Sequence, residues 1–402
     1  MRSAHMLLMT IFAIILLLII WMWIDFKLGI KKQRSEANRF VQEIRNGQCE
    51  MLTTGHDLFK KLITDINNAE KNIHVLFYIF RDDHIGTQVL KALKEKAIEG
   101  VEVRLLVDRV GCHISKKMRN ELKKVGVRFA HSHPPKFPYL FFTLNRRNHR
   151  KITVIDGHIG YIGGYNVGDE YLGRDPKFGD WRDIHLRIEG DGCQDLQEQF
   201  LQDWKVATRE KMDTKKYYPP LVKGLHQLKI VPSDGSFLEE SFINFIKEAK
   251  DSIYIGTPYF IPGKEIKDEL IAAAKRGVDV KLIVPKQGDH PLVKEAAFPY
   301  FQPLLEAGCT IYRYYRGFYH AKTIVIDKKI CDIGTANVDR RSFHINHEIN
   351  CLVFNKAFIK DVIAVMDYDI SISEQLTIDQ LKKRSFFHKS KEKIATVFAP
   401  LL

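Results

Sequence analysis

An uninterrupted apolar segment near the N-terminus is the most distinct part of the hydrophobic pattern. Between Met6 and Ile24 the only conspicuous polar residue is Thr10, and Trp21 and Trp23 lie at the interfacial end of the segment. As a helix it would be about 28 Å long, close to the roughly 30 Å hydrocarbon core of a bilayer. We therefore predict a transmembrane anchor over residues 6–24. A signal peptide is the alternative, although it would normally have a shorter apolar core and a small-residue cleavage site.

Charged residues around the anchor predict its orientation. Four basic residues follow it, at Lys27, Lys31, Lys32 and Arg34, whereas Arg2 and the terminal amine precede it. Because basic residues concentrate on the cytoplasmic side of membrane spans, we expect a single-pass protein of the cell membrane with the bulk of its chain in the cytoplasm. The polar residues 25–46 are predicted to form a linker, helical over about residues 29–46.

Beyond this linker, β-rich runs alternate with stretches of helical composition. Ile73–Phe80 and Val101–Val107 are rich in branched and aromatic residues, and Thr87–Glu99 between them has helical composition and ends before Gly100. This alternation predicts an α/β sandwich rather than an all-helical or all-β protein.

The same order of elements occurs twice. Gly100–Val107 resembles Gly277–Val284 at an offset of 177 residues, and a longer match further along has an offset of 171. Insertions in surface loops produce such small changes of offset. We predict two duplicated domains at residues 47–215 and 216–375, followed by a basic amphipathic tail at residues 376–402.

The charge and cysteine content limit the kinds of ligand and partner that the protein can bind. The 402 residues include 62 lysines and arginines against 49 aspartates and glutamates, which gives a formal net charge of +13. A basic protein attracts polyanions, and an anionic bilayer qualifies as well as a nucleic acid. The 6 cysteines are scattered without a C-x-x-C pair, so neither a zinc site nor a disulfide framework is predicted.

Each repeat carries the pattern H-x-K-x-x-x-x-D, followed by a glycine-containing stretch that ends in asparagine 17 residues after the histidine. One copy is a weak signal, but two copies at corresponding places in a duplicated fold are a strong one. The residues concerned are His149, Lys151, Asp156 and Asn166 in the first repeat and His320, Lys322, Asp327 and Asn337 in the second. Two histidines, two lysines and two asparagines that converge on one cleft suit phosphodiester chemistry.

The residue types indicate the roles. One neutral imidazole can attack phosphorus to form a phosphohistidine, while the other protonates the leaving alkoxide and then deprotonates the incoming hydroxyl. The motif lysines and asparagines can hold the phosphoryl oxygens. This chemistry requires no cofactor and no metal. The paired histidines His131/His133 and His344/His347 are interpreted as solvated or packed side chains.

Strand geometry separates the motif aspartates from the histidines. Side chains alternate between the two faces of a strand, so the histidine and lysine of each motif share a face. If the strand is unbroken, Asp156 and Asp327 have the opposite parity. We therefore predict that both aspartates are structural.

A catalytic histidine needs a carboxylate to orient its second ring nitrogen. Asp183 and Glu348, on corresponding predicted strands, follow His149 by 34 and His320 by 28 residues respectively. We take them as the candidate orienting carboxylates. The alternative is that both are surface charges on their strands.

These motifs resemble those of the phospholipase D superfamily, and more closely those of bacterial cardiolipin synthases. The likeness is carried by Arg147–Lys151, Tyr259–Pro262, Gly317–Lys322, Gly334–Phe343 and Phe398–Leu402. The resemblance implies two duplicated α-β-α sandwich domains packed around a shared active site. It also implies transfer of a phosphatidyl group from one phosphatidylglycerol to another with release of glycerol. Many cardiolipin synthases have two N-terminal spans, whereas this chain shows one.

In that superfamily the histidine of the first motif is usually the nucleophile. The resemblance therefore assigns nucleophilic attack to His149 and acid–base work to His320, although the symmetry of the motifs also allows the reverse. A hydrolytic phospholipase D would use the same residues, with water in place of the acceptor alcohol. If the protein were a nuclease, its apolar anchor would be unexplained. If it were a non-enzymatic membrane scaffold, it would not need both motifs.

Two further segments fit a lipid substrate. The loop Pro134–Phe142 is aromatic and interrupted by proline, so it can enter the bilayer interface or pack beneath the neighbouring domain. The tail places lysines and arginines beside phenylalanines, which suits an interfacial helix on an anionic leaflet, or a solvated charge run. We expect phosphatidylglycerol and anionic membrane lipid as partners, and no nucleic acid. The oligomeric state stays open.

Overall fold

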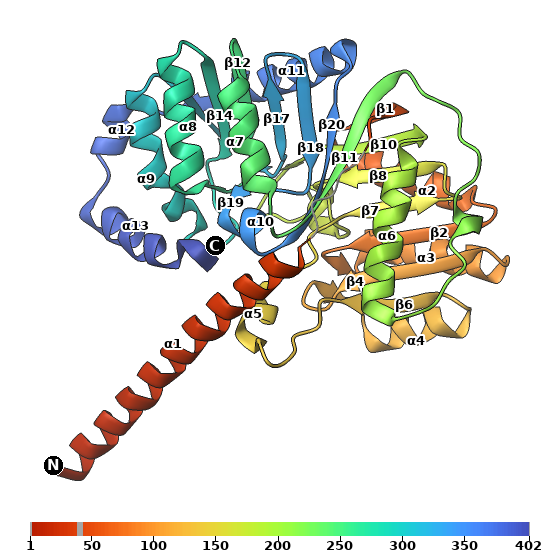
Figure 1. The fold of residues 1–402 in the computed structure, drawn as a ribbon, viewed down its shortest axis with the longest axis horizontal. Coiled ribbons are helices and arrows are strands. Elements are labelled where there is room, and N and C mark those ends of the chain that lie inside the picture. Colours follow the sequence, from red (N-terminus) through yellow and green to blue (C-terminus); the bar gives the residue numbers. More distant parts are fainter. Residues whose placement is uncertain (1, 38–42, 402) are drawn as a thin grey trace.

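The computed structural model of the protein describes residues 2–37 and 43–401. Figure 1 shows two α/β lobes side by side and a long helix, α1 (Arg2–Glu36), that projects away from them. Helix α1 is long and apolar enough to cross a membrane, and 0% of its most apolar window is buried in the protein.

The first part of the predicted linker over residues 25–46 is helical, because α1 continues without a break to Glu36. The physical reason is that this last part of α1 packs on the protein. Asp25 and Gln33 are buried, and the Gln33 side-chain amide donates to the carbonyl of Ile345 at 3.2 Å. Residues 38–42 of the predicted linker lie outside the described residues.

In the described part of the chain, 15 strands form one continuous sheet in the order β21-β15-β14-β12-β17-β18-β20-β11-β1-β10-β8-β7-β2-β4-β6. The first repeat contributes β1 (Arg45–Leu52), β2 (Asn72–Phe77), β4 (Glu102–Asp108), β6 (Arg128–Ser132), β7 (Ile152–Ile155), β8 (Ile159–Gly163) and β10 (His185–Gly190). The second contributes β11 (His226–Asp234), β12 (Ser252–Gly256), β14 (Asp279–Pro285), β15 (Thr310–Tyr314), β17 (Thr323–Ile326), β18 (Ile330–Gly334), β20 (His347–Val353) and β21 (Ser373–Gln375). Strands β1 and β11 pair antiparallel at the centre and so join the repeats.

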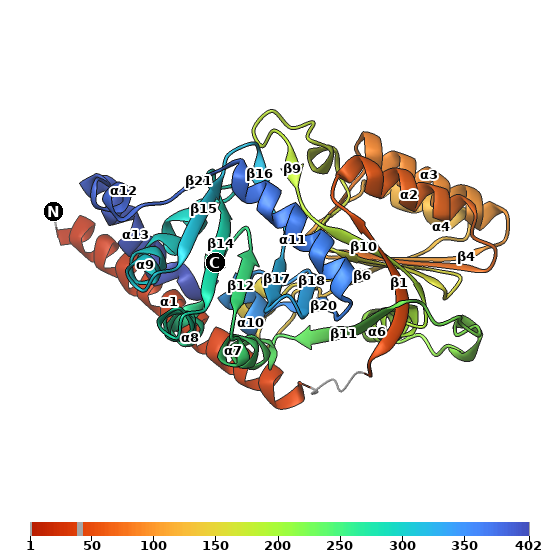
Figure 2. The same ribbon diagram turned by 90° about the horizontal axis from the view of Figure 1, so that it is seen from above.

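Helices cover both faces of this sheet (Figure 2). In the first repeat, α2 (Gly55–Asn67), α3 (His84–Ile98) and α4 (Lys116–Lys124) pack on one face, and α6 (Cys193–Thr208) packs on the other. In the second, α7 (Leu238–Glu248), α8 (Gly263–Lys275) and α9 (Val293–Glu306) face α11 (Lys356–Ser371) across the sheet. Strand β2 is buried along its whole length because helices cover both of its faces. The predicted pair of duplicated α-β-α sandwiches is confirmed.

Short connections between the repeats position the functional residues. Strand β9 (Trp181–Arg182) of the first repeat pairs in parallel with β16 (Phe318–Tyr319) of the second. On the other side, Asn148 forms an isolated bridge with His347 at the start of β20. Each motif histidine therefore lies next to backbone from the opposite repeat. The remaining short strands are β3 (Phe80–Arg81), β5 (Cys112–His113), β13 (Phe260–Ile261) and β19 (Val338–Asp339).

The predicted tail folds onto the second repeat. It forms α12 (Ile378–Lys382), α13 (Phe386–Phe398) and the 3₁₀ turn η3 (Ala399–Leu401). Ala395 and Ala399 are buried in a small core with residues of α9. The boundary predicted at residue 216 lies in the turn η2 (Lys215–Tyr217), where Tyr217 packs on the first repeat and its hydroxyl donates to Glu102 at 3.0 Å. The second repeat therefore begins at β11.

Candidate active site

His149 lies just before β7, held in place by backbone of the second repeat. Its N–H donates to the carbonyl of His347 at 2.9 Å, and the N–H of His347 donates to the carbonyl of Arg147 at 2.9 Å. Glu348 follows His347 on β20. Its carboxylate oxygens lie 2.9 and 3.1 Å from Nδ1 of His149, so the ring's Nε2 is left for the cavity.

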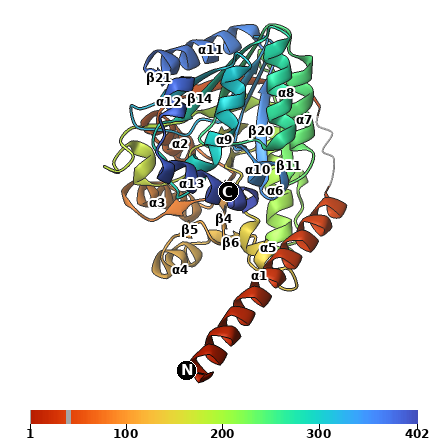
Figure 3. The ribbon, with the colours of Figure 1, turned by 90° about the vertical axis from the view of Figure 1, so that its left-hand side faces the viewer.

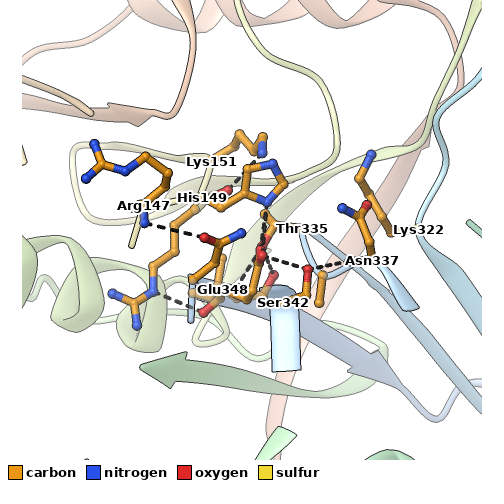
Figure 4. A network of polar contacts seen from close by, with 12 residues as sticks. Arg147, His149, Lys151, Lys322, Thr335, Asn337, Ser342 and Glu348 are labelled. Carbon is orange, nitrogen blue, oxygen red and sulfur yellow. Dashed lines mark hydrogen bonds and ion pairs between the residues drawn. The ribbon is translucent and has the colours of Figure 1, made fainter. Parts of the chain in front are cut away.

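Two hydroxyl groups complete the environment of Glu348 (Figure 4). Thr335 Oγ1 donates to one carboxylate oxygen at 2.6 Å, and Ser342 Oγ donates to the other at 3.0 Å. The Glu348 side chain is 1% exposed. Its charge is therefore compensated by hydrogen bonds rather than by water, and its orientation is fixed from two sides.

His320 has a matching arrangement with the roles of the repeats exchanged. Its N–H donates to the carbonyl of Arg182 at 2.7 Å, next to the β9–β16 pair. Asp183 comes directly after β9, and its Oδ2 lies 2.5 Å from Nδ1 of His320. The other carboxylate oxygen accepts the N–H of Ile184 at 2.8 Å.

The two carboxylates thus cross between the repeats: Glu348 contacts His149, and Asp183 contacts His320. Sequence spacing had related each carboxylate to the histidine of its own repeat. The crossing follows from the bridge between Asn148 and His347 and from the β9–β16 pair, neither of which a local pattern reveals. Neither carboxylate is a surface charge, because both are at most 1% exposed.

The motif lysines lie beneath the histidines. Lys151 Nζ donates to the carbonyl of His149 at 2.8 Å, and Lys322 Nζ donates to the carbonyl of His320. Both side chains are buried and neither lines the cavity described below. Lys322 Nζ is 3.7 Å from Asp183. In this arrangement the lysines hold the backbone of the histidines, and direct contact with phosphoryl oxygens stays a prediction.

Burial governs the protonation of the site. It lowers the pKa of His149 to about 4, against the attraction of Glu348. Burial and then the Lys322 ammonium lower the pKa of His320 to about 4, against Asp183. Burial also lowers the pKa of Lys322 to about 8. Both imidazoles are therefore neutral near pH 7, the state in which one can act as a nucleophile.

A cavity of about 630 Å³ joins these groups. Both histidines and both motif asparagines line it, so residues from the two repeats share one site. Asn166 Oδ1 accepts the N–H of Ile79 at 3.1 Å, and Asn337 Nδ2 donates to Asp339 at 3.0 Å. Each amide is oriented by the protein and keeps further hydrogen-bonding capacity for a ligand.

The motif aspartates lie away from the cavity, but not for the reason given by strand parity. Strand β7 begins at Ile152, so the histidine is not on an unbroken strand with Asp156. Asp156 stands after β7 with φ of 52°, and its carboxylate accepts the backbone N–H groups of residues 70–72 at 2.7–2.8 Å. Asp327 has φ of 51° and accepts those of residues 250–252. A structural role for both stays a prediction.

Sequence reasoning missed the aromatic side chains around the histidines. The ring of Tyr78 meets His149 edge-on at 5.1 Å, and the ring of Trp181 lies 4.9 Å from His320. It also missed Thr335 and Ser342, which orient Glu348. Both lie inside the stretch 334–343 that follows the second motif, and their place in that stretch was the one signal that could have been used. The packing of Tyr78 had no sequence signal.

The remaining histidine pairs pack against each other or lie beside polar side chains. His133 and His347 contact each other with ring centroids 4.3 Å apart, and burial lowers the pKa of both well below the usual value. His131 Nε2 accepts a hydrogen bond from Arg119 Nη1 at 3.0 Å, and His344 lies 3.5 Å from Glu239.

Comparison with known proteins places this arrangement in a family. The family model described as "Cardiolipin synthase, PLD-like domain" matches residues 62–204 and 242–370. The chain is 41% identical over 389 residues to the minor cardiolipin synthase ClsB of Bacillus subtilis, covering 96% of this chain and 98% of that one. It is 42% identical over 369 residues to a cardiolipin synthase of Clostridium perfringens, covering 89% and 78%.

Among solved structures, the chain is similar to a phosphatidylserine synthase of Haemophilus influenzae. The TM-score is 0.68 at 15% identity, over 93% of this chain and 100% of that chain. This likeness supports the fold alone. The family model and the two relatives show that the protein belongs to the cardiolipin synthase family with phospholipase D-like domains.

Proposed function

We propose that the protein is a cardiolipin synthase that transfers a phosphatidyl group from one phosphatidylglycerol to a second and releases glycerol. The observation that carries the proposal is the pair of neutral histidines facing one cavity, each oriented by a buried carboxylate of the opposite repeat. The names of the relatives support the choice of substrate. The anchor α1 supports a lipid substrate and a membrane location with the catalytic domain in the cytoplasm.

In the first step, Nε2 of His149 attacks phosphorus, and the bond between phosphorus and the glycerol oxygen breaks. His320 supplies the proton that the departing glycerol oxygen takes up. A bound phosphodiester carries a negative charge, which favours the protonated form of an imidazole and so raises the pKa of His320 from its value in the empty site. Glu348 stabilises the positive charge that His149 acquires on bonding to phosphorus.

In the second step, the neutral His320 accepts the proton of a hydroxyl group on the second phosphatidylglycerol. That oxygen attacks phosphorus, and the bond between phosphorus and His149 breaks. The products are cardiolipin and the free enzyme. Asn166 and Asn337, which line the cavity, are proposed to donate hydrogen bonds to the phosphoryl oxygens in both steps. The symmetry of the site also permits the reverse assignment of the two histidines.

The test is conversion of labelled phosphatidylglycerol by the purified full-length protein in mixed micelles, without added divalent metal. Cardiolipin and free glycerol in equal amounts are expected. Phosphatidic acid as the main product would instead indicate a hydrolytic phospholipase D built from the same residues. Cleavage of nucleic acid without turnover of lipid would overturn the proposal in favour of a nuclease.

A further inference from the structure

The C-terminal turn forms part of the catalytic cavity. Leu401 of η3 lines the cavity together with Arg341, which belongs to α10 (Arg340–His344). Arg341 Nη1 donates to the carbonyl of Leu401 at 2.8 Å. Its Nη2 donates to the carbonyl of Asn145 at 2.7 Å, at the end of α5 (Leu140–Asn145). One guanidinium group therefore joins the end of the tail to the end of α5 at the edge of the cavity.

Helix α5 in turn is attached to the membrane helix. The N–H of Phe142 donates to Oδ2 of Asp25 at 2.8 Å, and the rings of Phe26 and Phe141 are 6.0 Å apart. Together with the hydrogen bond from Gln33 to the backbone just after α10, these contacts fix the anchor relative to the cavity edge. Because α1 is fixed in this way, its direction determines which side of the protein faces the bilayer.

That side carries α5 and α13. Figure 1 shows α13 and the C-terminus on the side of the protein toward which α1 projects, and Figure 3 shows α5 directly beside α1. We define the rim as residues 134–145, α13 and η3. It exposes large apolar side chains, with Phe137 74% exposed, Phe386 and Phe387 each 79% and Val397 75%.

The chemistry of the rim matches an anionic bilayer. Lysines at 389, 391 and 393 alternate along α13 and accompany its exposed aromatic rings. Aromatic rings insert at the level of the lipid headgroups, and lysines bind the negative surface of anionic lipids. A protein partner would need neither the anchor at the same edge nor the lysines.

We propose that the rim lies in the headgroup layer of an anionic bilayer and that the phospholipid headgroup enters the catalytic cavity past Arg341 and Leu401. The acyl chains then stay in the membrane during the reaction, which avoids the unfavourable exposure of their methylene groups to water. The cavity is also lined by the polar residues Arg81, Glu170 and Lys177, which suit a polar leaving group such as glycerol. The inference rests on the proposed function and names the route of its substrate.

The test compares two forms of the same substrate. Full-length protein in phosphatidylglycerol vesicles is assayed beside protein given a short-chain phosphatidylglycerol that is soluble as a monomer. Substitution of Phe386→Ser together with Phe387→Ser is expected to lower turnover in vesicles by at least about tenfold, because two exposed rings no longer insert. Turnover of the short-chain substrate is expected to stay within about twofold, since these side chains are not part of the cavity.

The matched control is Val222→Ser with Leu225→Ser, in the connection between η2 and β11. These side chains are 85% and 81% exposed. The connection that carries them runs along the first repeat, away from α13 (Figure 1). No change is expected with either substrate. An equal loss on both substrates, or no loss in vesicles, would overturn the proposed route. Absence of turnover of both substrates by the unsubstituted protein would instead overturn the proposed function.

A binding measurement tests the rim without relying on activity. Tryptophan replaces Phe387 in one variant and Val222 in another, and both are reconstituted in vesicles that contain brominated phosphatidylglycerol. Quenching above that of the unsubstituted protein is expected for Phe387→Trp and not for Val222→Trp. Equal quenching of the two variants would place the rim in water and would overturn the proposal.

Discussion

Substitution of Glu348 by glutamine tests the crossed arrangement of carboxylates. Glutamine preserves the shape of the side chain and one carbonyl oxygen, but it removes the negative charge that faces Nδ1 of His149. The hydroxyl groups of Thr335 and Ser342 can rotate to accept as well as donate, so an amide can be accommodated at this position. The expected effect is therefore on catalysis rather than on folding.

The magnitude follows from the charge on the reacting imidazole. When His149 bonds to phosphorus it becomes positively charged, with the Glu348 carboxylate 2.9 Å from Nδ1. Opposite unit charges about 4 Å apart attract by about 4 kcal/mol at an effective dielectric constant of about 20. Loss of this attraction corresponds to a fall in kcat of about a thousandfold. The Michaelis constant should change much less, because the charge develops only during the reaction.

The assay measures kcat on phosphatidylglycerol in mixed micelles, together with thermal unfolding of the variant. The matched control is Glu50→Gln, which removes the same charge from a side chain that is 44% exposed and is expected to leave kcat unchanged. A Glu348→Gln protein that unfolds normally and retains kcat within about threefold would refute the role of this carboxylate.

Three further predictions follow from the site and its surroundings. The His320→Ala protein should fold and lose at least about a hundredfold in turnover, because the proton donor is removed; near-normal product formation would contradict the two-histidine mechanism. Asp156→Asn should lower the free energy of unfolding by about 1.5–3 kcal/mol, measured by denaturant titration, since the charge that accepts three backbone N–H groups is lost, while turnover of the folded fraction stays normal. A selective loss of turnover would refute a structural role. Burial lowers the pKa of His74 to about 3, so between pH 6.5 and 3 the unfolded state binds more protons than the folded state. The free energy of unfolding therefore decreases as the pH is lowered, by about 2 kcal/mol between pH 7 and pH 5. Unfolding midpoints of the unsubstituted and His74→Gln proteins between pH 7.5 and 5 measure this, and equal slopes would contradict it.

The duplicated fold could be predicted from sequence because its signals are local. Runs such as Val101–Val107 are rich in branched apolar residues, as strands require, and the second copy repeats them at a nearly fixed offset. The helical character of the linker was a local signal too, but its packing on the rest of the protein was not. In the structure, Asp25 and Gln33 lie on the continuing helix and form hydrogen bonds with the backbone of Phe142 and Ile345, respectively.

The histidines, asparagines and carboxylates of the site were identified from spacing, but their partners were not. Spacing along one strand cannot show that Glu348 meets His149, because that contact depends on a bridge between segments about 200 residues apart. The burial of Lys151 and Lys322 beneath the histidines also depends on packing of the two repeats. Such contacts between the repeats can be identified only from the three-dimensional structure, in which both repeats form one sheet.

The central claim is that His149 carries the phosphatidyl group between two phosphatidylglycerol molecules. The most direct measurement is rapid alkaline quenching of the full-length protein during turnover of phosphorus-labelled phosphatidylglycerol, followed by identification of the labelled peptide. We predict base-stable label on the peptide that contains His149, and no label on the His149→Ala protein. Label on the peptide of His320 alone, or cardiolipin formation without any labelled protein, would contradict this account.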